Sequence, residues 1–265
     1  MNFNHNIVLI VGASSGMGRL LALRLAAEGA YIIATARRQE LLDSLANEII
    51  HQGGRCLAFA VNAENSHAAE QLVATIVGQL GRIDVAVLNA GGAPALDMRQ
   101  MSAQEVTAYM RSNYDVTVNY LFPVLHQMSR QRKGLVVHTN SLAGFLGVPL
   151  QGPYSAAKGA LRLLIDTCRI EFGDRGIKFV SVYPGFVATA QTANDGMPAP
   201  FEISEKLAVS HILYAMHKEK SDYLFPFTLR WLVRLGLALP KSLTNRLLRS
   251  EVPALPNLPQ DTGST

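Results

Sequence analysis

A tyrosine and a lysine lie four positions apart in the segment 152–161, where an apolar helical pattern begins. Residues at this spacing share one face of a helix, so the phenol of Tyr154 and the ammonium group of Lys158 should lie side by side. A free phenol titrates at about pH 10, and a neighbouring cation lowers its pKa. The pair can therefore donate or accept a proton at a carbonyl or alcohol oxygen. The same spacing also arises by chance, with a solvated lysine beside a half-buried tyrosine, so its meaning depends on the rest of the chain.

The segments that must position this pair alternate between strand and helix patterns. Strands are predicted at 7–11, 31–36, 55–61, 84–88, 135–139, 177–182 and 222–225, and helices at 19–28, 39–51, 68–80, 103–131, 153–172 and 203–217. Such alternation predicts a parallel sheet with right-handed crossovers. We therefore expect a doubly wound α/β fold of the Rossmann type, with about seven strands and helices on both faces.

The chain of 265 residues has no internal linker, low-complexity block or short repeat that would divide it. We expect one nucleotide-binding and catalytic domain over residues 1–226 and a C-terminal extension over residues 227–265. From Pro253 onward, Pro, Asn, Gln, Asp, Gly and Ser dominate, and this composition predicts disorder.

A glycine-rich turn directly follows the first predicted strand. Glycine lets the backbone approach a ligand closely, and the N-terminus of the following helix offers N–H groups and a positive dipole end to an anion. The turn therefore predicts a binding site for the phosphates of a dinucleotide, although such a turn can also serve tight packing alone. Its candidate residues are Gly12, Ser14, Ser15, Gly16, Met17 and Gly18.

Two arginines follow the second predicted strand, at the place that lies beside the adenosine ribose in such folds. An acid there binds the 2′-hydroxyl of NAD, whereas an arginine accommodates the 2′-phosphate of NADP. The chain has Arg37 and Arg38 here and no acid before Glu40. A guanidinium binds phosphate through two parallel hydrogen bonds. The pattern predicts NADP(H), with Arg37 the first candidate and Arg38 the second; the alternative is two solvated residues at a helix start.

In this order, the motifs resemble the short-chain dehydrogenase/reductase family, in its compact single-domain branch, over residues 7 to about 190. The glycine turn is similar to the family's T-G-x-x-x-G-x-G, with Val11 in place of Thr. Leu88 to Gly91 is similar to N-N-A-G, with Leu88 in place of the first Asn. The resemblance implies that Asn89, Ala90 and Gly91 pass under the adenosine side of the cofactor. It also places Asn62 where an Asp usually stands beside the adenine.

The same resemblance assigns four catalytic residues. Asn113 aligns with the family's catalytic Asn, which holds a water that links the lysine to solvent, and Asn119 is a weaker competitor. Ser141 lies thirteen positions before Tyr154, the spacing of the family's catalytic Ser, and Asn140 replaces the first Ser of its S-S-x-A-G motif. Ser141 would polarise the substrate oxygen, Tyr154 would exchange a proton with it, and Lys158 would lower the pKa of Tyr154 and hold the nicotinamide ribose.

The resemblance also covers the end of the sixth predicted strand. The segment from Tyr183 to Thr189 is similar to P-G-x-V-x-T, which contacts the nicotinamide carboxamide in the family. The implied contact residues are Pro184, Gly185, Val187 and Thr189. The expected function is hydride transfer between NADP(H) and a carbonyl or secondary alcohol. The alternatives are an NADP(H)-binding sensor without catalysis, which the presence of both Tyr154 and Lys158 disfavours, and a sugar-nucleotide epimerase or dehydratase, which usually has a larger C-terminal domain.

A lid over the substrate pocket is expected at residues 190–207, where a polar stretch is interrupted by Gly and Pro. Apolar residues near the predicted site favour a lipophilic ketone or alcohol slightly over a sugar, although the same residues suit a plain core. They are Phe145, Leu146, Val148, Leu150, Phe186 and Met197.

Composition excludes several other classes of partner. The net charge is +4, and the cations are scattered rather than clustered with aromatic residues, which argues against nucleic acid. The two cysteines fit a reducing compartment, and with no signal sequence evident a cytoplasmic location is expected. The seven histidines show no metal-ligand spacing; His126 falls in a predicted helix and His138 in a predicted strand, where structural roles are expected.

The C-terminal extension contains an apolar segment with two arginines, followed by further basic residues up to Arg249. The stretch 228–249 is too short to span a bilayer. A basic amphipathic segment can lie on an anionic membrane surface, cap a substrate pocket or cover a subunit interface, and we favour packing over the membrane. The two long helices at 103–131 and 153–172 resemble those that form family interfaces, so a homodimer or homotetramer is expected.

Overall fold

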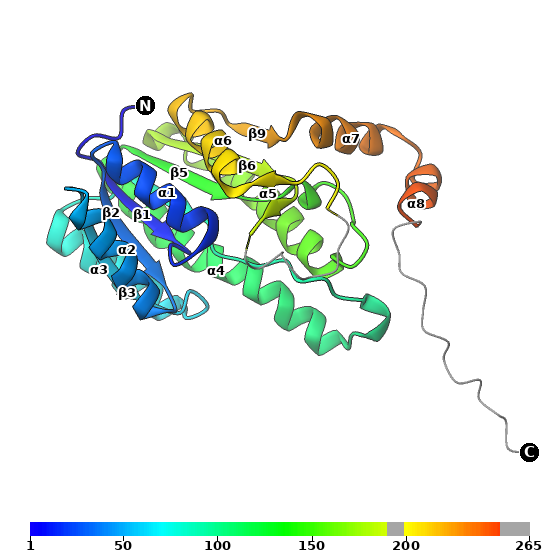
Figure 1. The fold of residues 1–265 in the computed structure, drawn as a ribbon, viewed down its shortest axis with the longest axis horizontal. Coiled ribbons are helices and arrows are strands. Elements are labelled where there is room, and N and C mark those ends of the chain that lie inside the picture. The colour runs from blue at the N-terminus through cyan, green and yellow to red at the C-terminus, as the bar shows by residue number, and fades with distance from the viewer. Residues whose placement is uncertain (190–198, 250–265) are drawn as a thin grey trace, which may run out of the picture.

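A seven-stranded parallel sheet forms the centre of the computed structural model, which describes residues 1–189 and 199–249 (Figure 1). The strands lie in the order β3-β2-β1-β4-β5-β6-β9. The order reverses direction between β1 and β4, and ligands of open α/β sheets bind outside the carboxyl ends of the strands at such a point. The bounds are β1 (Ile7–Val11), β2 (Tyr31–Ala36), β3 (Arg55–Ala60), β4 (Val85–Leu88), β5 (Gly134–Thr139), β6 (Ile177–Pro184) and β9 (Asp222–Phe225).

Helices cover both faces of the sheet and bury a separate apolar core on each. Residues of α1, α2 and α6 share one core, which includes Leu21 and Ile212. Residues of α3, α4 and α5 share the other, which includes Leu125 and Ile165. The strands contribute alternate residues to the two cores because successive side chains point to opposite faces. The helices are α1 (Gly16–Ala27), α2 (Gln39–His51), α3 (Ser66–Leu80), α4 (Ala103–Gln131), α5 (Gly152–Glu171) and α6 (Glu205–His217).

The long helix α4 begins at a reciprocal cap. The Ser102 hydroxyl accepts a hydrogen bond from the Glu105 backbone N–H at 3.3 Å, and the Glu105 carboxylate accepts one from the Ser102 backbone N–H at 2.7 Å. This capping box satisfies two backbone donors that a helix start leaves unpaired. The helix then continues through Pro123 to Gln131, as predicted.

Smaller elements complete the two edges of the sheet and the C-terminal end. Within the described residues, short 3-10 helices are η1 (Met98–Gln100), η2 (Leu142–Gly144) and η3 (Gly173–Arg175), the last of which leads into the start of β6. A two-stranded parallel ribbon joins β7 (Val187–Ala188) to β8 (Ile203–Ser204). After β9, α7 (Phe227–Ala238) and α8 (Lys241–Arg249) run away from the end of the sheet that carries α2 and α3 (Figure 1).

The predicted fold class is confirmed, and most strand and helix bounds agree to within two residues. One expectation was wrong at its start: residues 203–204 form β8 rather than the first turn of a helix. Ser204 instead caps α6, because its hydroxyl accepts a hydrogen bond from the Leu207 backbone N–H at 3.3 Å. The expected lid falls partly, and the expected disorder after Pro253 wholly, outside the described residues.

Candidate active site

The glycine-rich turn packs directly against the residues that follow β4. A Cβ atom on Gly18 would lie 2.1 Å from the Gly12 carbonyl oxygen, and one on Gly12 would lie 2.9 Å from the Ala90 backbone. The Asn89 side chain donates a hydrogen bond to the same Gly12 oxygen at 3.4 Å. A side chain at either glycine would force the turn away from β4, so the bare backbone here forms a cradle for a phosphate-bearing ligand.

A guanidinium lies over this turn. The Arg38 side chain donates hydrogen bonds to the Ser14 hydroxyl at 3.0 Å and to the Ser15 hydroxyl at 2.7 Å. Arg37, the first candidate from sequence, directly follows β2 and, like Arg38, is exposed. Met17, also a candidate from the turn, packs its side chain against the core. Only its backbone groups can therefore face a ligand.

The two asparagines that competed in the sequence have different surroundings. Asn113 is buried on α4, and its side-chain oxygen accepts a hydrogen bond from the Gly92 backbone N–H at 3.1 Å. Asn119 lies further along α4 and donates to the Ala63 carbonyl oxygen at 2.9 Å. Asn119 therefore braces the loop after β3, where Asn62 lies exposed, and Asn113 belongs to the site.

The active tyrosine and lysine lie in the first two turns of α5. The Lys158 side chain is only 4% exposed and donates a hydrogen bond to the Thr139 carbonyl oxygen at 3.0 Å. Its Nζ atom lies 5.6 Å from the centre of the Tyr154 ring. A Cβ atom on Gly91 would lie 3.7 Å from Lys158 Nζ and 2.9 Å from the Asn113 side-chain oxygen. Gly91, just after β4, therefore lies against both the Lys158 ammonium group and the Asn113 amide, and no side chain would fit there.

Burial controls the ionisation of both groups. It raises the pKa of Tyr154, and a hydrogen bond from Ser141 partly offsets that rise. Burial lowers the pKa of Lys158 to about 8. The net shift of the Tyr154 pKa is upward because burial disfavours the charged phenolate. At neutral pH, Tyr154 therefore holds its proton, as a general acid must.

Two further residues of the site were not singled out as functional from the sequence. Asn140 donates a hydrogen bond to the Lys158 carbonyl oxygen at 3.1 Å and accepts one from the Ser141 backbone N–H at 2.8 Å. Tyr109 donates to the Gly92 carbonyl oxygen at 2.8 Å and is close enough to Tyr154 for the two phenolates to repel. Tyr109 lies one helical turn before Asn113, and that spacing on one helix face was the available signal.

The segment expected to contact a nicotinamide lies at the carboxyl end of β6, next to β5. Pro184 ends β6, and the Gly185 backbone N–H donates to the Phe225 carbonyl oxygen at 2.8 Å. Val187 is buried in β7, and Thr189 follows that strand. The Asn140 backbone N–H donates to the Val182 carbonyl oxygen at 2.8 Å. Ser141 and the segment after β6 therefore share one edge of the sheet.

Histidine chemistry is not part of this arrangement. Among residues 1–189 and 199–249, no group of three or more His, Cys, Asp or Glu side chains is placed to hold a metal ion. His138 is buried in β5, and neither ring nitrogen has a hydrogen-bond partner. Burial, with a smaller effect of Lys158, lowers its pKa well below the ordinary value. His138 is thus a neutral core residue, though without the satisfied contacts expected of a structural histidine.

Comparisons with known proteins identify the family of this chain. The family model of short chain dehydrogenases matches residues 6–198. The chain is 33% identical over 189 residues to a 3-oxoacyl-[acyl-carrier-protein] reductase of Synechocystis sp., with 71% of this chain and 76% of the relative covered. It is 32% identical over 188 residues to a 3-ketodihydrosphingosine reductase of Bacteroides thetaiotaomicron, with 71% and 66% covered.

A solved structure has the same fold. A short-chain dehydrogenase from Streptomyces avermitilis matches with a TM-score of 0.76 and 24% identity, covering 94% of this chain and 97% of the other. The chain belongs to the short-chain dehydrogenase family. It is a hydride-transfer oxidoreductase of the kind that uses a nicotinamide cofactor.

Proposed function

We propose that this protein is an NADP(H)-dependent oxidoreductase that interconverts carbonyl and secondary alcohol groups. The observation that carries the proposal is the convergence of Tyr154, Ser141 and Lys158 at the sheet edge that also carries the glycine turn. Ser141 hydrogen-bonds the Tyr154 phenol, and Lys158 lies beside its ring. A hydroxyl that polarises an oxygen and a phenol that protonates it are the groups that carbonyl reduction requires.

The chain's own residues account for the proton in this reaction. When bound, the nicotinamide cofactor supplies the hydride in reduction and accepts it in oxidation. In reduction, Ser141 donates a hydrogen bond to the substrate carbonyl oxygen, and the Tyr154 phenol transfers its proton to that oxygen as the alcohol forms. Lys158 and Asn113 then return a proton from solvent to the Tyr154 phenolate. In oxidation, the same oxygen gives its proton back to Tyr154.

The cofactor preference rests on Arg38. Its guanidinium already contacts two hydroxyls of the turn, which places a permanent positive charge beside the phosphate cradle. A 2′-phosphate on the adenosine ribose would pair with this charge, whereas the 2′-hydroxyl of NAD(H) would gain little from it. No acid precedes Glu40 after β2. Arg37, exposed at the same strand end, is the second cation that a 2′-phosphate can reach.

The substrate is proposed to be a lipophilic ketone or its alcohol. Apolar residues Phe145 and Phe186 pack with Leu142, which directly follows Ser141. A hollow of about 320 Å³ is lined by the segment from Ala143 to Gly147, which begins two residues after Ser141, and by Gly152, Ser155 and Ala156. Relatives named for acyl and sphingoid ketones favour the same choice.

Assembly and location complete the proposal. We place α4 and α5 at the interface of a homodimer or homotetramer, because exposed apolar side chains such as Leu163 and Ile170 lie on α5. Both cysteines are free and buried, which suits a reducing compartment such as the cytoplasm. No helix within residues 1–189 and 199–249 is both long enough and apolar enough to cross a membrane.

The deciding experiment follows NADPH absorbance across a panel of ketones, aldehydes and quinones, with Tyr154→Phe run beside the wild type. We expect turnover by the wild type and a loss of about 10² to 10⁴-fold in the variant, the range that general acid catalysis supplies. Cofactor binding, followed by NADPH fluorescence, should be similar in both proteins. Tight NADPH binding without turnover on any carbonyl would point instead to a cofactor sensor.

A further inference from the structure

We propose that α7 and α8 form a docking surface for an anionic lipid bilayer. This inference goes beyond the proposed oxidoreductase function and can be tested without turnover. It reverses the preference for packing alone that the sequence suggested. The reason is that α7 packs with one face only, and its opposite face is apolar and exposed.

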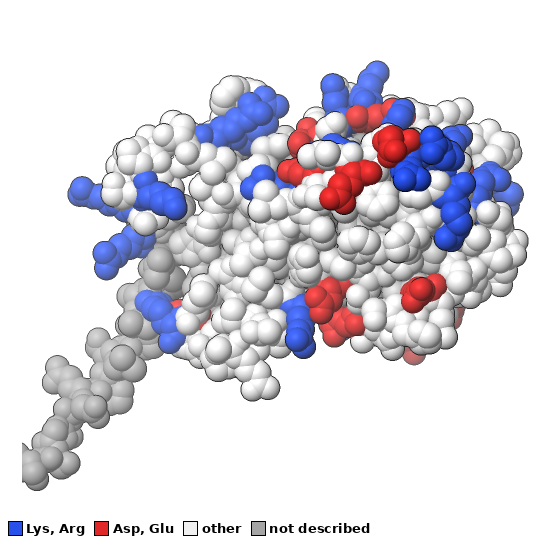
Figure 2. All heavy atoms as spheres, turned by 180° about the vertical axis from the view of Figure 1, so that it is seen from behind, with Lys and Arg blue, Asp and Glu red and all other residues white. Residues whose placement is uncertain are grey.

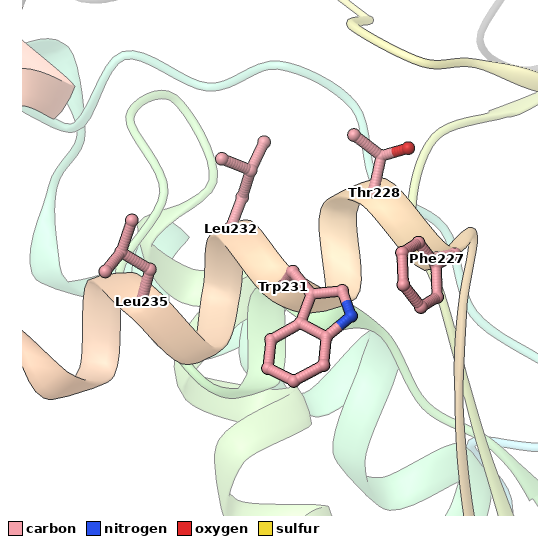
Figure 3. Close-up of a pocket in the computed structure, with 5 residues that line it drawn as sticks. All are labelled: Phe227, Thr228, Trp231, Leu232 and Leu235. Carbon is pink, nitrogen blue, oxygen red and sulfur yellow. The ribbon is translucent and has the colours of Figure 1, made fainter.

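The exposed face of α7 consists of large apolar side chains. Phe227, Trp231 and Leu235 are 69%, 48% and 56% exposed. With Thr228 and Leu232 they line a shallow hollow of about 430 Å³, in which Phe227 and Trp231 form one edge and Leu232 and Leu235 the other (Figure 3). Exposed apolar patches of this kind on a folded chain mark a surface for another molecule.

Positively charged side chains occur along both α7 and α8. Neither helix contains an acidic residue, and together they carry five cations: Arg230, Arg234, Lys241, Arg246 and Arg249. The guanidinium groups of Arg230 and Arg234 lie 5.5 and 5.4 Å from the centre of the Trp231 ring. The end of the molecule with these helices accordingly shows many basic and few acidic side chains on the face drawn in Figure 2. Tryptophan beside arginine suits the boundary between lipid headgroups and acyl chains.

The helix α8 likewise combines exposed apolar side chains with basic ones. On α8, Leu243 and Leu247 are exposed and lie one helical turn apart. Lys241, Arg246 and Arg249 occupy the rest of its length. Long basic side chains can bury their carbon stems in lipid and keep their charges at the phosphate level. The two helices together thus offer both terms of interfacial binding, apolar area and attraction to anionic headgroups.

The inner face of α7 packs on a buried apolar cluster close to the candidate active site in sequence. Leu229 packs with Leu142 and Tyr183, and Val233 packs against the same cluster beside Phe145. Leu142 directly follows Ser141. A Cβ atom on Gly236 would lie 3.0 Å from Leu146, one of the residues that line the hollow of about 320 Å³. The helix that carries the exposed apolar face therefore packs, with its other face, on residues that directly follow Ser141.

Charge argues for lipid rather than a second copy of the chain. A two-fold interface brings the same patch of both subunits together. Here it would set five cations, without an acid in either helix, against five identical cations, and such like-charge contacts oppose association. An anionic bilayer meets the same surface with the opposite charge.

The test uses the full chain and its single tryptophan. Because Trp231 is the only tryptophan among the 265 residues, the emission spectrum reports this helix alone. The protein would be mixed with vesicles of phosphatidylcholine, with or without about one third phosphatidylglycerol, and followed by emission and co-sedimentation. We expect a blue shift and sedimentation with the anionic vesicles only, both weakened by high salt.

Charge-reversed variants localise the effect. Arg234→Glu combined with Arg246→Glu should weaken vesicle binding at least tenfold. The control, Lys218→Glu combined with Lys220→Glu, makes the same change in net charge at the opposite end of β9 and should bind like the wild type. Leu232→Ser with Leu235→Ser, which keeps every charge, should also lose binding. Unchanged NADPH binding would show that each variant is folded.

Two results would overturn the proposal. One is wild-type protein that binds neither type of vesicle. The other is binding that the variants of α7 and α8 leave unchanged. If light scattering showed in addition that Leu232→Ser with Leu235→Ser converts an oligomer to a monomer, the surface would be a subunit interface. Because vesicle binding requires no catalysis, these results are distinct from a failure of the proposed reaction.

Discussion

The side chain of Asn140 links the two halves of the catalytic site: it donates to the Lys158 carbonyl oxygen at 3.1 Å and accepts from the Ser141 backbone N–H at 2.8 Å. Asn140 is 2% exposed, and its hydrogen bond to the Lys158 carbonyl oxygen is buried. The loop that carries Ser141 and the helix that carries Lys158 are thereby held in one fixed arrangement. Asn140 is a positioning residue, because it acts through the groups on either side of it.

Replacing Asn140 by alanine should therefore lower kcat more than it changes the KM for the cofactor. Leaving the two buried partners unpaired should also reduce the free energy of unfolding by about 1–3 kcal/mol. Steady-state kinetics and thermal unfolding measure both effects. Asn119→Ala is the matched control, because it also removes an amide that donates to a backbone carbonyl. It should lower stability but spare kcat at saturating cofactor, and an equal loss of kcat in both variants would contradict the assignment.

The activity of carbonyl reduction should fall as pH rises through about 8, the value to which burial lowers the pKa of Lys158. Below that pH the ammonium group is charged and can hold the ribose and assist the Tyr154 phenol; above it the charge is lost. Burial raises the pKa of Tyr154, so the tyrosine keeps its proton across this range. The measurement is kcat/KM from pH 6 to about 10.

Lys158→Arg provides the control for this pH dependence, because a guanidinium stays charged throughout. The variant should lose activity overall, yet the remaining activity should show its alkaline fall at a higher pH. An unchanged alkaline limb would assign the titration to another group. The sign for stability is separate: the unfolded chain binds this proton up to about pH 10.4, so between about 8 and that value this group makes folding more favourable as pH rises.

Arg38→Ala should remove most of the preference for NADPH over NADH. A charged hydrogen bond is worth about 1.5–3 kcal/mol, so the KM for NADPH should rise by about 10- to 100-fold while that for NADH changes little. Arg37→Ala, one residue earlier at the exposed strand end, should have the smaller effect. If Arg37→Ala raised the KM for NADPH more than Arg38→Ala, Arg37 would be the main ligand of the 2′-phosphate, as the sequence predicted. If neither variant changed that KM, the 2′-phosphate would bind elsewhere.

Two glycine-to-alanine changes should have opposite signs. Gly18→Ala places a Cβ atom 2.1 Å from the Gly12 carbonyl oxygen, so the turn must move; we expect lost NADPH affinity and about 1–3 kcal/mol of destabilisation, as for other overpacked positions. Gly78 lies inside α3, and a Cβ there meets nothing within 4 Å. Gly78→Ala should stabilise by about 0.5–1 kcal/mol. Thermal unfolding and cofactor titration would be measured for both variants. Equal changes in stability would contradict the prediction that only Gly18 has no room for a side chain.

Sedimentation or light scattering at micromolar concentration should show a dimer or tetramer. Ile170 on α5 is 82% exposed, and burial between subunits would account for its position. Ile170→Asp should shift the mass towards the monomer, because it places a charge in an apolar interface. Ile50→Asp, at another exposed apolar residue on α2, should leave the mass unchanged. A monomeric wild-type protein would rule out this assembly.

Most of the fold could be predicted because local patterns determine it. The apolar run of β1 and the helical periodicity of α4 are visible in the sequence, and even Pro123 did not interrupt the predicted helix. The ribbon of β7 and β8 could not be predicted, because two-residue strands carry no periodicity and depend on a partner distant in sequence.

The site was predictable in its residue types but not in its finer arrangement. Motif order predicted Asn113, Ser141, Tyr154 and Lys158 as catalytic residues, which stays a prediction, and their surroundings followed only from packing. Arg37 and Arg38 are consecutive at a strand end, and the sequence does not say which one turns towards the glycine turn. Nor did the sequence indicate that burial, a property of the whole fold, raises the pKa of Tyr154.

The pairing of Val187 with Ile203 and of Ala188 with Ser204 closes a loop whose two ends are fixed beside each other. The entropic cost of such a loop grows slowly, by about 0.6 kcal/mol for each doubling of its length. Insertions and deletions between the two short strands should therefore leave the sheet and the four catalytic residues in place. The length of this connection can thus change without rebuilding the sheet.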